Sequence, residues 1–202
     1  MKLHHSPRSP YVRKVRVAAH ELGLHDRLEL IEATVQNVIE QVSPDNPLGQ
    51  IPTLVLDDGT ALYDSPVIVD FLDTLHDAPP LIPRAGPERW RALGQQALGD
   101  AMMDQAIAIY SDPARKLGEP LSSMTRRRTD RLERCLDTLE TNLDELGGAT
   151  TIGLISVGCA LGYLDFRLKP DFWRPGRAAL AAWADRFAER PSMRSTPHLP
   201  AE

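Results

Sequence analysis

Apolar and polar residues alternate along the chain with two periods, one typical of β-strands and one typical of helices, and the strand period is found only before about residue 77. Before this point, short runs typical of β-strands are interleaved with runs whose apolar residues recur every three or four positions, as on one face of a helix. The βαβαββα order of these runs predicts a four-stranded mixed sheet that is covered by helices. The predicted strands are residues 2–5, 27–32, 53–56 and 61–63, and the predicted helices are residues 10–22 and 65–75, with a weak helix or an irregular segment at residues 36–42.

The strand pattern disappears in the rest of the chain. Residues 76–87 contain four prolines and form a predicted linker. The fold class is therefore α/β plus all-α, with an N-terminal domain at residues 1–77 and an all-helical domain at residues 88–202. The predicted helices of the second domain are residues 88–110, 122–146, 151–167 and 177–190, followed by an irregular tail at residues 191–202.

The composition narrows the class of protein. The chain has 202 residues, of which 42% are apolar, and this is enough to build the cores of two small domains. The formal net charge of −5 argues against nucleic-acid binding, which normally needs a basic face. No run approaches the roughly 20 apolar residues of a membrane span, and the first residues lack the apolar stretch of a secretory signal. With two cysteines and no paired spacing among six histidines, the sequence predicts a cytoplasmic protein without a disulfide framework or a metal site.

Residues 6–16 join the first strand to the first helix. Ser9 is a good N-cap and Pro10 a good first helical residue, so this helix begins with unpaired backbone N–H groups and a partial positive charge. An anion such as a thiolate, a carboxylate or a phosphate would be stabilised there. From this segment alone, Ser9 either only caps its helix or also contacts such an anion.

Pro52 stands directly before the third strand, although proline removes a backbone hydrogen-bond donor. A cis bond between Ile51 and Pro52 would turn the chain sharply and leave the N–H and C=O of Ile51 open to an added extended peptide. The alternative is a trans proline at an ordinary strand start, and the residues alone leave both open.

The residues Asp64 and Ser65 precede the next helix, and Ser65 is its predicted N-cap. The helix N-terminus and the hydroxyl suit a ligand carboxylate, while the Asp64 carboxylate suits a ligand ammonium group. Together they would bind an α-amino-acid headgroup. The alternative is simple capping.

Taken in their order and spacing, these three segments resemble the motifs of the glutathione S-transferase family. The matching residues are 6–13, 46–54 and 64–68, and residues 158–165 are similar to the buried sixth helix of that family. The resemblance covers essentially the whole chain. It implies a thioredoxin-like N-terminal domain and an all-helical C-terminal domain.

The resemblance also implies a role for each site residue. Ser9 matches the activating serine of the zeta- and tau-like classes, where the omega-like class has cysteine, and would hydrogen-bond the glutathione sulfur. Ile51, before Pro52, would pair with the cysteinyl backbone of glutathione. The implied residues for the two ends of glutathione are Asp64 and Ser65 at the γ-glutamyl end and Gln50 at the glycyl carboxylate. The implied second-substrate pocket is bordered by Tyr11, Met102, Met103, Ala106 and Tyr110.

The implied activity is a detoxifying transferase that activates the glutathione thiolate for attack on a small, apolar electrophile. The alternatives are a glutathione-dependent isomerase and a non-enzymatic binding or regulatory protein. The resemblance further implies a homodimer. One departure from the family pattern is Leu154, which replaces the usual Asp of a capping box begun by Thr151 and should cost on the order of 1 kcal/mol.

Overall fold

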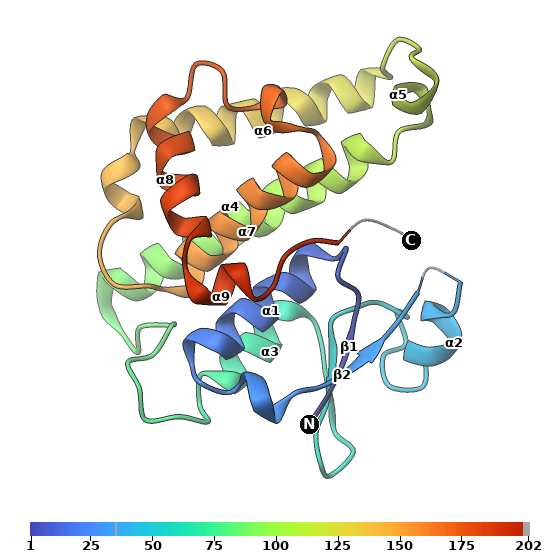
Figure 1. Ribbon diagram of the computed structural model, residues 1–202, viewed down its shortest axis with the longest axis vertical. Helices are drawn as coiled ribbons and strands as arrows, with labels where there is room; N and C mark the ends of the chain where they lie inside the picture. The colour runs from blue at the N-terminus through green and yellow to red at the C-terminus, as the bar shows by residue number, and fades with distance from the viewer. Residues whose placement is uncertain (35, 200–202) are drawn as a thin grey trace. The chain divides into compact units, whose positions relative to one another are not determined.

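The computed structural model describes residues 1–34 and 36–199, and it contains two compact units (Figure 1). The first unit combines Met1–Arg89 with the segment that starts at Pro191, and the second unit is Trp90–Arg190. The predicted domains, 1–77 and 88–202, differ from these units chiefly in the final segment, whose residues 200–202 lie outside the described residues.

The first unit is built on the predicted four-stranded mixed sheet, which is confirmed. The strand order is β2-β1-β3-β4. β1 runs parallel to β2 and antiparallel to β3, and β3 runs antiparallel to β4. The strands are β1 (Lys2–His5), β2 (Glu29–Glu32), β3 (Thr53–Val55) and β4 (Ala61–Leu62).

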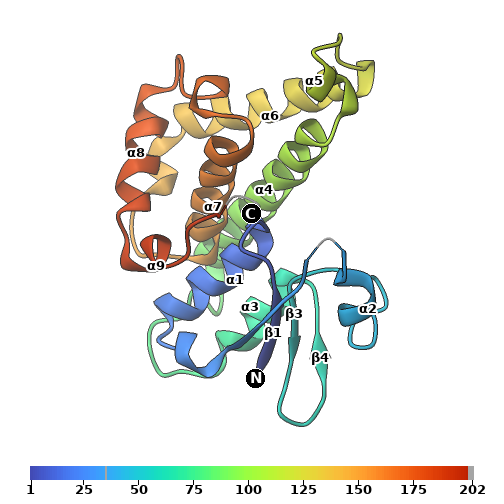
Figure 2. The same ribbon diagram turned by 45° about the vertical axis from the view of Figure 1, so that its right-hand side comes forward.

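Helices cover both faces of this sheet. α1 (Pro10–Glu21) and α3 (Ser65–Leu72) lie together on one side, and α2 (Val38–Val42) lies on the other, as Figures 1 and 2 show. A 3₁₀ turn, η1 (His25–Arg27), follows α1. The core between the sheet and the pair α1 and α3 is mainly apolar, because apolar side chains at helical spacing meet those of the central strands. Its members include Leu3, Val15, Leu54, Ile68 and Leu72.

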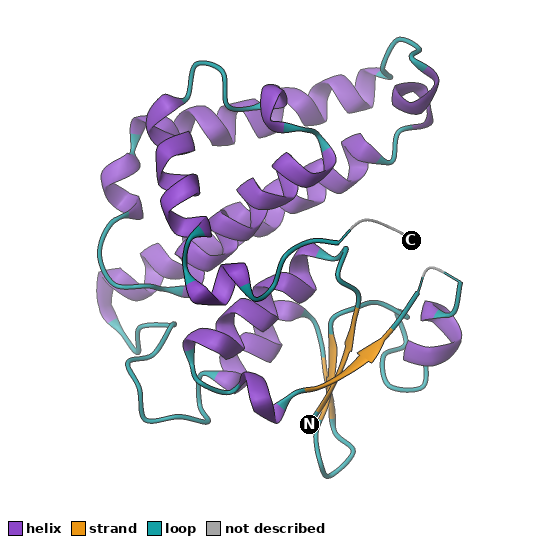
Figure 3. Cartoon of the chain, in the orientation of Figure 1, coloured by secondary structure: helices purple, strands orange, loops and turns teal. Residues whose placement is uncertain are grey.

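Helices joined by loops build the second unit, and no strand occurs within residues 90–190 (Figure 3). No helix in the described part of the chain has the length and apolar character needed to cross a membrane. The elements of the second unit are α4 (Gly86–Tyr110), which starts in the first unit, α5 (Pro113–Leu117), α6 (Ser123–Thr141), η2 (Leu143–Leu146), α7 (Ile152–Arg167), η3 (Pro170–Phe172) and α8 (Ala178–Ala188).

One sequence prediction about this unit is wrong, and one short helix was not predicted. The single helix predicted over residues 122–146 ends at Thr141, and a separate 3₁₀ turn follows it. The short helix α5 has no counterpart among the predictions. Asp112 caps it, accepting a hydrogen bond from the Ala114 N–H at 2.9 Å, and Gly118 ends it with φ of 70°. Both misses concern short elements, whose capping residues also suit turns.

The centre of the second unit is α7, as its continuous apolar run predicts. Every residue from 152 to 161 is buried. Thr151 caps the helix by accepting a hydrogen bond from the Leu154 N–H at 3.4 Å. Leu154 itself is buried, and its apolar side chain cannot accept the reciprocal bond of a capping box.

Close backbone approaches hold α7 against α4 and α8. A methyl group added at Gly99 of α4 would lie 2.6 Å from the backbone carbonyl carbon of Ser156. One added at Gly158 would lie 2.4 Å from the ring of Phe187, on α8. A β-carbon at either position would therefore force a neighbouring group to shift, which is unfavourable in a closely packed interior.

The segment 191–199 is not the irregular tail that the sequence predicts. It begins with the short helix α9 (Pro191–Arg194) and packs on α1 within the first unit. Arg13 donates a hydrogen bond from Nη2 to the carbonyl of Met193 at 3.3 Å. Further hydrogen bonds join Ser192 to Glu21, Ser195 to His20 and His198 to the carbonyl of Pro7.

The proline-rich linker is anchored by Asp73 at the end of α3. The Asp73 side chain is buried, and it accepts hydrogen bonds from the N–H groups of Leu81 at 2.7 Å and Ile82 at 3.0 Å. His76 Nε2 lies 3.2 Å from the same carboxylate. The first part of the predicted linker is therefore an integral part of the first unit.

Candidate functional site

Ser9 is the N-cap of α1, as predicted. Its Oγ accepts a hydrogen bond from the Val12 N–H at 3.3 Å, and Pro10 is the first helical residue. The Ser9 N–H donates to the carbonyl of Ser6 at 3.1 Å, which holds the turn after β1. Within residues 1–34 and 36–199, the Ser9 hydroxyl donates no hydrogen bond, so its proton stays available to a ligand.

The peptide bond between Ile51 and Pro52 is cis, which decides between the two alternatives left by the sequence. Pro52 is buried and Ile51 is partly exposed. Gln50, just before them, is exposed. Ile51 and Gln50 are thus accessible beside a buried proline at the start of β3.

Two buried polar residues that the sequence reasoning missed shape this loop. Asn46 Nδ2 donates hydrogen bonds to the carbonyl of Gln50 at 3.1 Å and to Thr53 Oγ1 at 3.0 Å. The Thr53 hydroxyl donates to the same carbonyl at 2.7 Å. Buried polar side chains whose hydrogen-bonding groups are all paired are rigid, so Asn46 and Thr53 hold the loop in place. The available signal was Asn before Pro, with a threonine opening the strand, a pattern typical of turns closed by side chains.

The start of α3 differs from the prediction in one respect. The N-cap is Asp64, and Ser65 is the first helical residue, so the prediction of Ser65 as the cap is wrong. The Asp64 carboxylate makes no capping bond to α3. It is exposed and has no partner among the described residues, whereas Ser65 is buried. The peptide bond between Tyr63 and Asp64 is also cis.

The sheet brings the three segments together at one end of its strands, where β1 and β4 end and β3 begins, and this end is called the edge of the sheet. Because β1 and β3 are antiparallel, the end of β1, which leads to Ser9, lies beside the start of β3, where Pro52 stands. β4 is also antiparallel to β3, so its end, which leads to Asp64, reaches the same edge. The N-termini of α1 and α3 therefore both begin here, with their partial positive charges.

The residues predicted for a second-substrate pocket fall in both units. Tyr11, on α1, is partly buried in the first unit. On α4, Met102, Met103 and Ala106 are fully buried. Tyr110, at the end of the same helix, is partly exposed. The role of these residues stays a prediction.

An arginine among aromatic rings at the end of α7 was not found from the sequence. The guanidinium carbon of Arg167 lies 4.5 Å from the ring centre of Tyr110, 4.4 Å from that of Phe166 and 5.9 Å from that of Tyr163. Burial raises the pKa of the Tyr163 hydroxyl, and the nearby Arg167 opposes the rise. The signal in the sequence is the spacing of Tyr163 and Arg167 on one helix face.

Comparison with known proteins identifies the family to which the chain and its fold belong. Residues 3–80 match the description "Glutathione S-transferase, N-terminal domain", and residues 124–186 match "Glutathione S-transferase, C-terminal domain". The Escherichia coli K12 protein named "Uncharacterized GST-like protein YibF" is 32% identical over 199 residues, which are 97% of this chain and 98% of that protein. This chain belongs to the glutathione S-transferase family.

Solved structures of family members are similar over nearly the whole chain. A glutathione transferase family member from Pseudomonas fluorescens Pf-5, crystallised with bound glutathione, is 42% identical with a TM-score of 0.92, over 98% of this chain and 99% of that one. Another structure of a family member from that strain has bound S-(propanoic acid)-glutathione; it is 44% identical with a TM-score of 0.87, over 100% of both chains. The predicted family and fold are thereby confirmed.

Proposed function

We propose that this protein binds glutathione at the sheet edge formed by Ser9, Ile51 and Asp64, and activates its thiol for attack on a small electrophile. The observation that carries the proposal is the convergence of the three segments at this edge, with the Ser9 hydroxyl proton unused in the described part of the chain. The glutathione and the S-(propanoic acid)-glutathione bound to the Pseudomonas fluorescens proteins support the choice of ligand.

Each part of glutathione then has a partner. The exposed Asp64 carboxylate would bind the γ-glutamyl ammonium, and the start of α3 at Ser65 would bind the neighbouring carboxylate. The cysteinyl backbone would pair with Ile51, as a short added strand. Gln50, which is exposed beside it, would contact the glycyl carboxylate.

The chemistry expected of Ser9 is stabilisation of charge. The thiolate is the nucleophilic form of a thiol, and a hydroxyl donor together with a helix N-terminus favours it. One hydrogen bond to a charged group contributes about 1.5–3 kcal/mol, which lowers the thiol pKa substantially. Ser9 already accepts the Val12 N–H, and it could donate its own proton to sulfur without losing that bond.

The second substrate is proposed to be an electrophile whose carbon can accept the thiolate. Addition of the glutathione thiolate to the β-carbon of acrylate would give a propanoic acid conjugate, the kind of ligand that the Pseudomonas fluorescens protein binds. In that addition the C–S bond forms, the carbon–carbon π bond opens, and the α-carbon takes up a proton. Acrylate and its neutral analogue acrylamide are therefore suitable first electrophiles.

Thiol–disulfide exchange is not favoured, because Ser9 stands where a reactive cysteine would be needed. Neither cysteine of the chain is suited to that reaction. Burial raises the pKa of the Cys135 thiol, and Cys159 is fully buried within α7.

The deciding experiment separates binding from activation. Glutathione affinity is measured by calorimetry, and turnover with acrylate and acrylamide is followed by loss of free thiol. Ser9→Ala should bind glutathione within a few-fold of the wild type but lose at least about ten-fold in turnover, the equivalent of about 1.4 kcal/mol. The matched control is Ser122→Ala, which removes a similar cap from α6, where Ser122 Oγ accepts the Thr125 N–H at 3.1 Å.

The outcomes distinguish the readings. If Ser9→Ala turns over as fast as the wild type, Ser9 is only a cap. Binding without turnover of any electrophile would favour a non-enzymatic glutathione-binding protein, and failure to bind glutathione would refute the proposal. A homodimer remains an expectation from the family resemblance, and a cytoplasmic location remains one from the composition; light scattering of the purified protein tests the first.

A further inference from the structure

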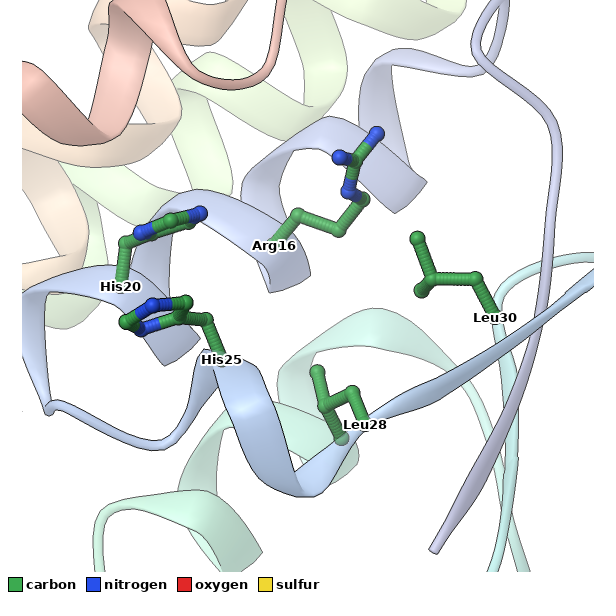
Figure 4. A pocket seen from close by; sticks show the side chains of 5 residues that line it. All are labelled: Arg16, His20, His25, Leu28 and Leu30. Carbon is green, nitrogen blue, oxygen red and sulfur yellow. The ribbon is translucent and has the colours of Figure 1, made fainter.

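A hollow lies in the first unit, away from the edge that carries Ser9. Its volume is about 190 Å³. Figure 4 shows side chains converging on it from α1, from η1 and from the strand β2. In the parallel register, β2 begins beside the start of β1, so the hollow lies toward the opposite end of the sheet from Ser9. The lining residues are Arg16, His20, His25, Leu28 and Leu30.

Arg16 is the permanent charge of this hollow. It is partly buried, and within residues 1–34 and 36–199 its guanidinium has no carboxylate or hydrogen-bond partner. Burial is the main cause that lowers the pKa of Arg16, and the nearby Arg13 lowers it further. Arg16 also lowers the pKa of His5, on β1, while Glu32 raises it. A partly desolvated guanidinium without a partner is unfavourable, and an anion would relieve that cost.

Two histidines form the wall beside Arg16. The rings of His20 and His25 stack with their centres 4.0 Å apart and an angle of 13° between planes. Burial lowers the pKa of His20, followed by the influence of His25 and Arg16, while Asp26 and Glu21 raise it without reversing the shift. His20 is therefore predominantly neutral near pH 7, and added negative charge would favour its protonation.

The opposite wall is apolar. Leu28 and Leu30 line it, and Leu30, in β2, is 39% exposed, which is high for a leucine in a strand. Figure 4 shows both leucines across the hollow from the imidazole pair, with Arg16 between the two walls. A ligand that satisfies both walls needs one anionic end and one aliphatic end.

We propose that this hollow binds a small aliphatic monocarboxylate, with its carboxylate on Arg16 and its chain against Leu28 and Leu30. A guanidinium pairs with a carboxylate through two parallel hydrogen bonds. Water occupies about 30 Å³ per molecule in the liquid, so the hollow suits an acid of a few carbons rather than a long fatty acid. A phosphate fits less well, because it would leave the apolar wall uncovered.

Binding of such an acid is linked to proton uptake. A carboxylate beside Arg16 would cancel part of the positive field that lowers the pKa of His20. The pKa of His20 should therefore rise when the ligand binds, and the affinity should increase as the pH falls toward that pKa. Asp26 and Glu21 act in the same direction at all times, so they do not mask the change.

The experiment is a titration of the full chain with hexanoate, followed by nuclear magnetic resonance of the histidine ring signals. The expected result is saturable movement of the His20 and His25 signals and a raised His20 pKa at saturating hexanoate. Hexan-1-ol, which keeps the chain without the charge, and inorganic phosphate, which keeps charge without the chain, should each bind at least ten-fold more weakly.

Two variants and one control test the contacts. Arg16→Gln should weaken hexanoate binding at least ten-fold, and Leu30→Asn should weaken hexanoate but not phosphate. Arg27→Gln is the control, because Arg27 is exposed on η1 and does not line the hollow. Glutathione affinity is measured for each variant and should not change, which keeps this site separate from the proposed function.

The proposal is overturned if the histidine signals do not respond to hexanoate, or if hexan-1-ol binds as tightly as the acid. It is also overturned if Arg16→Gln, shown to be folded by its unchanged glutathione affinity, binds hexanoate as the wild type does. Phosphate binding stronger than hexanoate binding would replace the carboxylate with an inorganic anion and refute the role given to the leucines.

Discussion

The tight contact between α4 and α7 makes a quantitative prediction possible. Gly94 and Gly99 lie five residues apart on α4, but only Gly99 touches another helix. A β-carbon at Gly99 would meet the backbone of Ser156 at 2.6 Å and its oxygen at 2.8 Å, whereas one at Gly94 would meet nothing within 4 Å. Alanine at the two positions therefore tests packing and helix propensity separately.

The magnitudes follow from those two environments. In a helix interior, alanine is better than glycine by about 1 kcal/mol, so Gly94→Ala should stabilise the protein by up to that amount. Gly99→Ala has the same gain in helix propensity, but the added β-carbon would meet the backbone of α7. Because this backbone cannot rotate away as a side chain can, α7 must move by several tenths of an ångström. Overpacking of this kind costs typically about 1–3 kcal/mol. The difference between the two variants isolates that cost, so we expect Gly99→Ala to be less stable than Gly94→Ala by about 1–3 kcal/mol.

Urea unfolding followed by tryptophan fluorescence is the suitable assay. The chain has three tryptophans, Trp90, Trp173 and Trp183, and all belong to the second unit. The signal thus reports on the unit that contains the contact. The midpoints should differ while the slopes stay equal, which marks a change in stability rather than in the extent of unfolding. Equal midpoints for the two alanine variants would refute the close packing described for Gly99.

Two further predictions concern other parts of the molecule. The fully buried Trp173 donates its indole N–H to Asp165 at 2.7 Å, and Arg174 pairs with the same carboxylate at 2.6 Å. Loss of these bonds in Asp165→Ala should lower the free energy of unfolding by about 2 kcal/mol, and Asp165→Asn, which keeps an acceptor for Trp173, should cost less in the same urea assay. Burial, and then Arg16, lowers the pKa of His5 below its ordinary value of 6.5, so the unfolded chain binds a proton more readily than the folded one. Stability should therefore rise with pH up to about 6.5, and His5→Gln should flatten that rise between about pH 5 and pH 7.

The sequence predicts the sheet and the long helices because their apolar periods are regular. The run from Pro10 and the continuous apolar stretch of α7 each allow only one kind of element. Short elements carry less information, so α5 was missed, and the break between α6 and η2 at Thr141 was not seen. The same holds for the segment from Pro191, whose order depends on hydrogen bonds to α1 rather than on its own pattern.

For the site, residue type was a good guide and exact position was not. The pairing of Ser9 with a helix start was predictable, because capping is a local property. The cap of α3 moved by one residue from Ser65 to Asp64, since both residue types suit the position. Asn46 makes hydrogen bonds to residues four and seven positions further along the loop. The role proposed for Arg16 depends on its having no carboxylate partner among the described residues. Neither property could be found without the fold.

The hydrogen bonds between segment 191–199 and α1 have a consequence for biosynthesis. Domains generally fold in the order in which the ribosome makes them. Here α1 is made early, but its partners in that segment are translated only after the whole of Trp90–Arg190. The second unit is continuous in sequence and can be completed first. The part of the protein that emerges first on the ribosome is thus the last to be finished, and the surface of α1 that the segment will cover stays open to chaperones until then.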